Sequence, residues 1–352
     1  MHPTKIDRTC EQIAAAEYPI ELRERLGERW NSLTKPAGSL GQLETIGTQY
    51  ACIRNTVEPH LGSKAIYIFC ADHGVVAEGV SLYPQSVTVE MMRNFVRGGA
   101  AINVLCQAHE MEAVIVDMGA AGEKVEDVLD CRLANGTANF AKEPAMSIDL
   151  ATRAIETGID LAEEAAKRYD IVGLGEMGIG NTTSAAALLA AFAGLTGAQV
   201  AGRGTGLDQA GVMHKANVID AALALHSPNP ENGLAVLAAL GGLEIAAIAG
   251  FMLGAASHRL PVMLDGFISC AGALVARAIC PESLRSCLFS HASAEQAHRH
   301  MLGFLDVQPL LQLDLRLGEG TGAALAIHLL ETSIRLLSEM ATFDAAGVSK
   351  AE

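Results

Sequence analysis

Short apolar segments alternate with helix-like sequence along this chain, and that alternation limits the folds that it can adopt. The apolar segments lie at residues 64–70, 113–117, 170–174, 261–264 and 286–289. Each is followed closely by glycine, aspartate, glutamate or histidine, as when parallel strands finish in functional loops. The pattern therefore predicts an α/β fold around a parallel sheet. Because the carboxyl ends of parallel strands meet at one edge, we expect the functional site there.

The first sixty residues carry no strand pattern. Residues 5–34 are typical of two amphipathic helices separated at Pro19. Ser39 and Gln42 then have the spacing of a capping box, which predicts a helix that continues to about Arg54. The N-terminal segment is thus expected to be helical throughout.

The chain of 352 residues has room for one large domain and a smaller one. We expect residues 1–60, together with the C-terminal helix 323–345, to form a small helical domain. Residues 61–322 are then the α/β catalytic domain. Within it, the sequence predicts one continuous helix over about 86–107, and Ser147 can cap a further long helix.

Charge and cysteine usage exclude several classes of partner. The net charge of −15 argues against a nucleic acid or an anionic membrane, since both bind basic surfaces. The eight cysteines form no Cys-x-x-Cys pair and the N-terminus lacks the apolar centre of a signal peptide, so a cytoplasmic protein is expected. Residues 235–256 resemble a membrane span, but Gly241, Gly242 and Glu244 in the interior favour two consecutive buried helices.

A glutamate lies between glycines in residues 316–322, directly before an apolar run typical of a helix that begins at about Thr321. Flanking glycines allow a sharp bend and let a ligand approach the backbone closely. The start of the helix adds unpaired N–H groups beside this loop. Glu319 is therefore a candidate catalytic group. The alternative is a tight turn with a solvated glutamate.

A second glycine-rich segment, residues 173–178, matches the dinucleotide-binding fingerprint. The acidic residue that would bind a ribose about 20 positions later is missing, because residues 185–202 contain no carboxylate. Glu176 would also repel a pyrophosphate. A single phosphate at Gly178 and the 181–183 turn, with Glu176 facing an uncharged part of the ligand, fits better. A dinucleotide site stays an alternative.

A metal site is the other alternative that single residues suggest. Asp72-His73 and the group His291, His298 and His300 contain ligand-type side chains, but neither has the spacing of an HExxH motif. We expect neither metal nor cofactor. The two carboxylates in glycine-rich loops, Glu176 and Glu319, instead indicate acid–base chemistry beside a phosphate, because burial can raise a carboxyl pKa towards neutral pH.

Five motifs together are similar to the nicotinate-nucleotide–dimethylbenzimidazole phosphoribosyltransferase family. They are KPxGSLG at 35–41, ADHGV at 71–75, GEMG with NTT at 175–183, LDGF at 264–267 and RLGEGTG at 316–322. The resemblance implies a three-layer α/β/α fold with a mainly parallel, Rossmann-like sheet, a small helical domain and a homodimer. It implies transfer of the 5-phosphoribosyl group from nicotinate mononucleotide to 5,6-dimethylbenzimidazole. The products would be α-ribazole 5′-phosphate, for the lower ligand of cobalamin, and nicotinate.

The resemblance also implies roles for individual residues. Glu319 would be the general base, and Glu176 a second acidic group at the reaction centre. The phosphate- and ribose-binding residues would be Gly178, Asn181, Thr182, Lys215, Asp265, Gly266 and Ser293. The base pocket would contain Tyr83, Met91, Met177 and Leu317.

The base pocket departs from the family pattern, which often has small or polar residues near Tyr83 and Met91. One aromatic ring and two thioethers can favour a different flat base, so adenine or a phenolic base is an alternative acceptor. Two further function classes are open to this sequence. One is a dinucleotide-dependent oxidoreductase, and the other is a non-catalytic subunit of a paired enzyme, against which both glutamates argue.

Overall fold

The computed structural model describes residues 3–16, 20–204 and 206–349, so the predicted helix break at Pro19 lies outside the described residues. Its centre is a six-stranded sheet in the order β3-β2-β1-β4-β5-β6, with every pair parallel. The strands are β1 (Lys64–Ala71), β2 (Glu112–Gly119), β3 (Leu129–Asp130), β4 (Ile171–Met177), β5 (Val262–Leu264) and β6 (Cys287–Phe289). This is the strand order of dinucleotide-binding folds, and it confirms the predicted parallel, Rossmann-like sheet. The two-residue strand β3 was not predicted.

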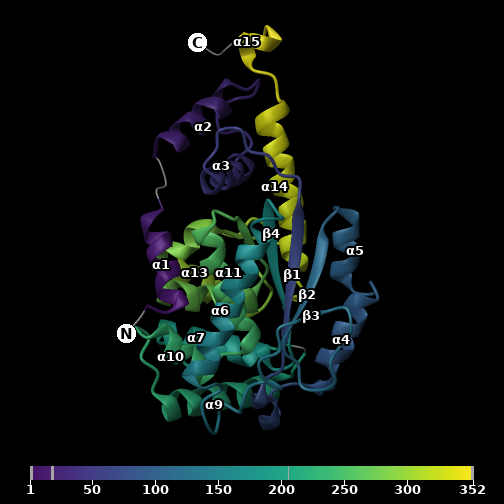
Figure 1. Cartoon of the computed structure of the whole chain (residues 1–352), viewed down its shortest axis with the longest axis vertical. Helices are drawn as coiled ribbons and strands as arrows, with labels where there is room; N and C mark the ends of the chain where they lie inside the picture. The colour runs from purple at the N-terminus through teal and green to yellow at the C-terminus, as the bar shows by residue number, and fades with distance from the viewer. Residues whose placement is uncertain (1–2, 17–19, 205, 350–352) are drawn as a thin grey trace.

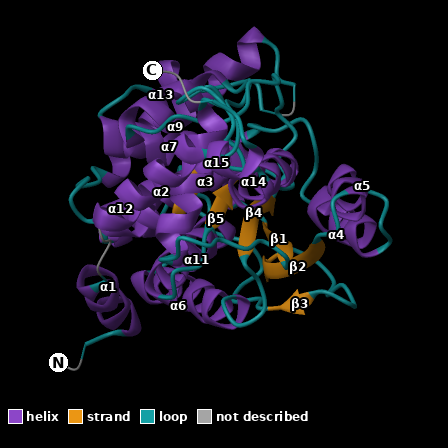
Figure 2. Ribbon diagram, turned by 90° about the horizontal axis from the view of Figure 1, so that it is seen from above, coloured by secondary structure: helices purple, strands orange, loops and turns teal. Residues whose placement is uncertain are grey.

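Helices cover both faces of the sheet, which makes three layers. Alternate residues of β1 divide between the faces: Tyr67 and Phe69 belong to one apolar cluster, whereas Ile66 and Ile68 belong to another. In Figure 2, α6 (Ile148–Ala165) and α11 (Leu243–Ser257) lie on one side of the strands, and α5 (Ala101–Ala108) and α14 (Thr321–Glu339) lie on the other. Both faces of the strands are therefore buried, as parallel sheets require.

The first layer of helices packs on the cluster of Tyr67 and Phe69. It contains α1 (Lys5–Ala15), α6 (Ile148–Ala165), α7 (Asn181–Ala193), α8 (Gly197–Val200), α9 (Gln209–His226), α10 (Gly233–Leu240), α11 (Leu243–Ser257), α12 (Phe267–Ile279) and α13 (Gln296–Leu305). The opposite layer contains α3 (Gln42–Arg54), α4 (Ser86–Val96), α5 (Ala101–Ala108) and α14 (Thr321–Glu339). The remaining helices are α2 (Ile20–Ser32), α15 (Phe343–Ala346) and two short 3₁₀ turns, η1 (Gly74–Glu78) and η2 (Pro281–Ser286).

Helices α2, α3 and the end of α14 share a separate apolar cluster around Trp30 and Leu337. These elements lie at one end of the molecule, opposite α9 and α10 (Figure 1). The first helix, α1, packs instead against α11 of the large layer. The division into a small domain of 1–60 with 323–345 and a catalytic domain of 61–322 stays a prediction.

Two predicted helices begin or end differently in the structure. The single helix expected over 86–107 is two helices, because the chain turns at Gly98, whose φ is +76°. The predicted capping box of Ser39 and Gln42 is wrong, since Gly41 is the N-cap residue of α3. The carboxylate of Glu44 instead accepts the N–H of Leu40 (3.0 Å). A side chain of the first turn thus binds the backbone just before the N-cap, in place of the expected contact of Ser39.

The apolar segment 235–256 forms α10 and α11, which confirms two consecutive buried helices. Within the described ranges, no helix combines the length and the apolar character needed to span a bilayer.

Candidate active site

A cavity of about 250 Å³ opens at the carboxyl ends of β4, β5 and β6, the edge where the sequence predicts the site. Most of the predicted site residues line it: Tyr83, Glu176, Met177, Gly178, Asn181, Thr182, Asp265, Gly266, Ser293 and Leu317. Strand ends and the loops after them thus bring together residues from distant parts of the chain. Three predicted residues, Met91, Lys215 and Glu319, are not among its lining side chains.

Glu176 is the penultimate residue of β4 and not a loop residue, because the strand continues to Met177. Its side chain is buried and accepts a short hydrogen bond from the amide of Asn181. Burial, followed by the negative charges of Asp265 and Glu244, raises the pKa of Glu176 to about 8. The carboxyl group is therefore largely protonated at neutral pH.

The two first glycines of the dinucleotide fingerprint also lie inside β4. A Cβ on Gly175 would lie 2.4 Å from the backbone nitrogen of Gly320, and one on Gly173 would lie 2.4 Å from Ile66. These glycines permit close packing against the 316–322 loop and the strand beside them. They do not form the turn that would cradle a pyrophosphate.

Glu319 has a left-handed backbone, with φ of +63° between Gly318 (+86°) and Gly320 (+89°). That conformation is unfavourable for a residue with a side chain and is concentrated at functional sites. The carboxylate is buried, and its Oε2 atom has no hydrogen-bond partner among the described residues. Burial raises its pKa, while the N–H of Ile102 in the first turn of α5 opposes that rise. Glu319 therefore faces the α5 side of the sheet edge.

Asp265 holds the loop of Glu319 in place. Its Oδ1 accepts the N–H groups of Gly322 (2.7 Å) and Ala323 (3.2 Å), and its Oδ2 accepts that of Gly320 (3.1 Å). These donors include the unpaired amides at the start of α14, the helix start predicted at Thr321. The side chain, predicted to bind ribose or phosphate, is 1% exposed and serves as the cap of this helix.

Lys215 and the loop of Gly178 form a corner suited to an anion. The ammonium group of Lys215 is buried and donates to Oγ1 of Thr182 (3.1 Å), beside the cavity. Burial lowers its pKa to about 8, so the group is still mostly charged at pH 7. At Gly178, a Cβ would lie 2.1 Å from the carbonyl oxygen of Ala71, so only glycine fits. Ser293, across the cavity, donates through Oγ to the carbonyl of Leu315 (3.2 Å).

The sequence analysis did not predict the hydrogen bonds that hold the loop of Gly178 in place. The hydroxyl of Thr88 donates to Asp72 (2.7 Å) and accepts the N–H of Ile179 (3.1 Å). This pair of bonds connects α4 to the loop after β4. It also missed Glu295 and Arg316, which line the cavity. Arg316 is the first residue of the RLGEG motif, but the spacing of that motif did not predict a role for its side chain.

The four residues predicted for the base pocket separate into two groups. Tyr83, Met177 and Leu317 line the cavity, and Tyr83 and Leu317 are 50% and 58% exposed. Met91 and Met177 are partly buried and pack on the apolar cluster of α4, α5 and α14. A flat apolar ligand between these groups would lie on the same side of the sheet as Glu319.

Two of the histidines considered as metal ligands, His73 and His298, form hydrogen bonds within the protein. Nε2 of His73 lies 2.6 Å from Oε1 of Glu244 in the core, and Nδ1 of His298 accepts the N–H of Ser293 (2.9 Å). Burial lowers the pKa of His298 to about 3, so its ring is neutral. In the described part of the chain, no three His, Cys, Asp or Glu side chains converge as metal ligands.

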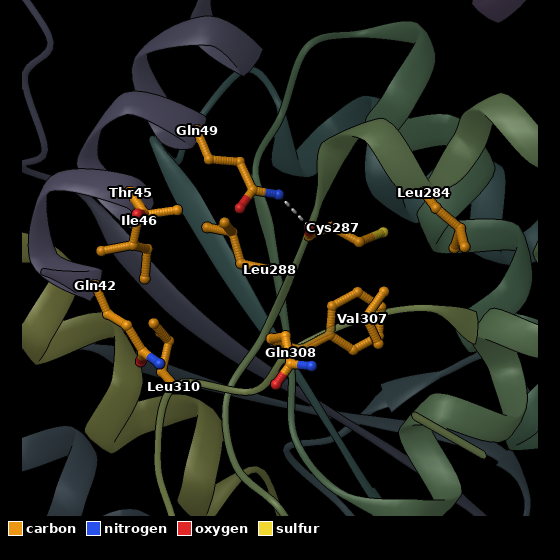
Figure 3. A pocket seen from close by; sticks show the side chains of 11 residues that line it. Gln42, Thr45, Ile46, Gln49, Leu284, Cys287, Leu288, Val307, Gln308 and Leu310 are labelled. Carbon is orange, nitrogen blue, oxygen red and sulfur yellow. Dashed lines mark hydrogen bonds between the residues drawn. The ribbon is translucent and has the colours of Figure 1, made fainter. Parts of the chain in front are cut away.

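A separate cavity of about 300 Å³ lies between α3 and β6 (Figure 3). Its walls are mainly apolar and glutamine side chains, and Gln49 donates to the carbonyl of Cys287 (3.0 Å). None of the predicted site residues lines it. The cavity at the carboxyl edge therefore remains the candidate active site.

Comparisons with known proteins agree on one group of relatives. A family model described as phosphoribosyltransferase (DBI_PRT) matches residues 17–348. The chain is 50% identical to a nicotinate-nucleotide–dimethylbenzimidazole phosphoribosyltransferase of Geobacter sp. strain M21, over 96% of this chain and 99% of that one. It is 49% identical to the enzyme of the same name from Desulforamulus reducens, over 99% of both chains. The crystal structure of CobT from Thermus thermophilus superposes with a TM-score of 0.90 at 44% identity, covering 94% of this chain and all of that chain.

Proposed function

This chain belongs to the nicotinate-nucleotide–dimethylbenzimidazole phosphoribosyltransferase family, and from that premise we infer its reaction. It transfers the 5-phosphoribosyl group from nicotinate mononucleotide to 5,6-dimethylbenzimidazole. The products are α-ribazole 5′-phosphate, used for the nucleotide loop of cobalamin, and nicotinate. A dinucleotide-dependent oxidoreductase is not favoured, because the fingerprint glycines lie within β4.

The observation that carries this function is the meeting of two buried carboxyl groups and an anion-binding corner at one sheet edge. Glu176 lines the cavity beside Gly178 and Thr182, and Lys215 donates to Thr182. Glu319 is joined to Glu176 by a backbone hydrogen bond of 3.3 Å. A sugar phosphate anchored at Lys215 can therefore place its ribose near both carboxyl groups.

We assign Glu319 the role of general base. When a ring nitrogen of the benzimidazole forms its bond to C1′, the bond from C1′ to the nicotinate nitrogen breaks. The other ring nitrogen loses its proton, and the free Oε2 of Glu319 can accept it. A base held between Met177 and the α5 side would bring that proton within reach. Attack opposite the departing nicotinate gives the α configuration.

We assign Glu176 an electrostatic role at the ribose. Positive charge develops on C1′ and the ring oxygen as the pyridinium leaves, and a carboxylate at this position stabilises it. The pKa of Glu176 is about 8, so much of the group is protonated at neutral pH. Binding of the positively charged pyridinium donor would favour the ionised form. The proposed contacts of the sugar phosphate are Lys215, which donates to Thr182 beside the cavity, and the lining residues Gly178, Asn181, Thr182, Gly266 and Ser293.

We infer the acceptor base from the relatives, because their names specify dimethylbenzimidazole. These similarities do not favour adenine or a phenol as the acceptor. Tyr83, Met91, Met177 and Leu317 are the proposed surroundings of this base.

We further propose a cytoplasmic enzyme, in keeping with eight free cysteines. We also propose a homodimer, because large apolar side chains at the cavity are exposed: Leu317 by 58% and Tyr83 by 50%.

A mass-spectrometric product assay tests this function. The purified chain is incubated with nicotinate mononucleotide and an equimolar mixture of dimethylbenzimidazole, adenine and p-cresol. We expect α-ribazole 5′-phosphate and nicotinate in equal amounts, with dimethylbenzimidazole consumed first. Absence of any phosphoribosylated product under these conditions would refute the assignment. Gel filtration of the same sample tests the dimer.

A further inference from the structure

The side chain of His73 is buried between residues near the starts of α7 and α11. Its Nδ1 atom lies 3.2 Å from Oγ of Ser184 in α7, and its Nε2 atom lies 2.6 Å from Oε1 of Glu244 in α11. All three residues have an exposed fraction of 0%, and none of them lines the candidate active site. The three side chains therefore form a closed polar group in the core, whose protons can be placed from its hydrogen bonds.

Ser184 fixes the position of one proton on the ring of His73. Its Oγ atom lies 2.7 Å from the carbonyl oxygen of Leu240 and 2.9 Å from that of Gly241. Carbonyl oxygens only accept hydrogen bonds, so the single hydroxyl proton must point to one of them. The hydroxyl can then only accept from the ring, and this requires a proton on Nδ1 of His73.

The contact between His73 and Glu244 requires a second proton. At 2.6 Å, Nε2 and Oε1 need a proton between them, because two lone pairs that face each other would repel. Since Nδ1 is already protonated, the pair is either an imidazolium beside a carboxylate or a neutral ring that accepts from a protonated carboxyl group. Both arrangements hold one proton more than a neutral ring beside a carboxylate. Neither carries a net charge.

The surroundings of the pair favour retention of this proton. The ionisable groups that interact electrostatically with Glu244 include Cys70, Asp72 and Glu176, which are all acidic and buried. Negative charge on any of them opposes a net negative charge on the pair. The Oε2 atom of Glu244 also has no hydrogen-bond partner among the described residues. An unpaired carboxylate oxygen is costly to bury, and a shared proton lessens that cost.

His73 also contacts the turn of residues 180–183, which begins α7 and contains part of the proposed phosphate site. A Cβ on Gly180, the N-cap residue of α7, would lie 3.1 Å from Cβ of His73. Asn181 and Thr182 follow directly and line the cavity. The bond from the ring to Ser184 thus holds this turn against the start of α11.

We propose that His73 positions the phosphate-binding turn 180–183 through a proton that it shares with Glu244. This inference depends on the proposed function, because it takes that turn as a binding site for the donor's phosphate. The shared proton leaves Nδ1 free to donate to Ser184. The opposite tautomer would turn a lone pair towards Oγ and push the start of α7 away. His73 touches no substrate and is a positioning residue.

NMR of the wild-type protein with ¹⁵N-labelled histidine tests the shared proton directly. The signals of His73 are those that change in Ser184→Ala, which removes the partner of Nδ1. At neutral pH, we expect a proton on Nδ1 and a strongly deshielded proton in the bond between Nε2 and Glu244. A ring that is protonated on Nε2 alone would overturn the proposal.

Kinetics with two donors test the positioning role. In Ser184→Ala, we expect the preference for nicotinate mononucleotide over nicotinate riboside, as a ratio of kcat/KM, to fall by about 2–10-fold, the effect of one neutral hydrogen bond. The change should appear in the KM of the nucleotide. Ser338→Ala removes a hydroxyl that also donates to a helical carbonyl (3.0 Å), and it should leave the preference unchanged. An equal fall for both donors in Ser184→Ala would show a general loss of structure and would refute the role.

Two variants of Glu244 separate the hydrogen bond from the charge. The amide of Glu244→Gln can donate to Nε2 without any charge, so this variant should keep the preference, whereas Glu244→Ala should lose it. A loss in Glu244→Gln as large as in Glu244→Ala would show that a full negative charge is needed, which contradicts a shared proton. If the wild type transfers from neither donor, the proposed function fails, and the NMR measurement by itself decides whether the proton is shared.

Discussion

The backbone N–H of Glu319 donates a hydrogen bond to the backbone carbonyl of Glu176, across 3.3 Å. The two carboxyl groups that we assign to catalysis are thus connected by main chain, although they lie far apart in the sequence. Gly318 makes this approach feasible, since a Cβ there would lie 2.4 Å from Oε1 of Glu176. A rigid link between the two groups preserves their separation, which catalysis by positioned groups requires.

Replacing Glu319 by glutamine tests the general base. We expect Glu319→Gln to fold normally and to lose turnover by about 10²–10⁴-fold, because glutamine cannot accept the proton. The measurement is kcat with saturating donor and acceptor, alongside thermal unfolding. Glu339→Gln, at an exposed position of α14, is the matched control and should retain full activity. Near-wild-type kcat in Glu319→Gln would remove this residue from the mechanism.

Replacing Glu176 by glutamine should change how stability depends on pH. Its pKa in the folded protein, about 8, is above the usual 4.5 of a glutamate in an unfolded chain. The folded state therefore holds this proton more tightly, and the associated stability is fully present below pH 4.5. It is lost progressively as the pH rises from 4.5 through 8, and no further loss follows above that.

Thermal unfolding of wild type and Glu176→Gln at about pH 5 and pH 9 measures this effect. We expect Glu176→Gln to gain stability relative to wild type at the higher pH and to gain little at the lower one. Turnover should fall in the variant at the higher pH, where the wild-type carboxyl group is ionised, because the charge that stabilises the ribose is gone. An unchanged difference in Tm between the two pH values would show that the carboxyl group titrates normally.

Lys215 can be tested with donors that differ only in the phosphate. Lys215→Met should raise the KM for nicotinate mononucleotide by about 10–100-fold, the effect of losing a hydrogen bond from a charged group. It should scarcely change the weaker use of nicotinate riboside, which has no phosphate. Lys124→Met, at an exposed position, serves as the control. Equal effects on both donors would place the phosphate away from Lys215.

Replacing Asp265 by alanine tests whether its side chain binds the substrate or stabilises the fold. Asp265→Ala leaves the N–H groups of Gly320, Gly322 and Ala323 without their acceptor. Unsatisfied buried groups cost about 1–3 kcal/mol each, so we expect a loss of about 3 kcal/mol or more in the free energy of unfolding. Urea unfolding measures it. A variant of unchanged stability whose donor KM is raised would support the ribose- or phosphate-binding role predicted from the sequence.

Much of the fold could be predicted from the sequence, because parallel strands and capped helices have local signatures. The five strands expected from apolar segments are all present, and Ser147 caps α6 as predicted. Two predictions were wrong at glycines, because glycine can serve different structural roles. Gly98, with φ of +76°, turns the chain after α4, and Gly175 lies inside a strand to let another loop approach. Neither use leaves a pattern in the neighbouring residues.

The sequence by itself determined the parallel sheet, its functional edge and the motifs that identify the family, since these depend on residue order and short-range pattern. Only the tertiary structure decided what each polar group does there. Asp265 and Lys215 are both isolated charges in the sequence, yet the first caps α14 and the second remains available beside the cavity. That difference depends on which backbone amides reach a side chain after the sheet forms. Such contacts between distant segments are fixed by packing, which a local pattern does not encode.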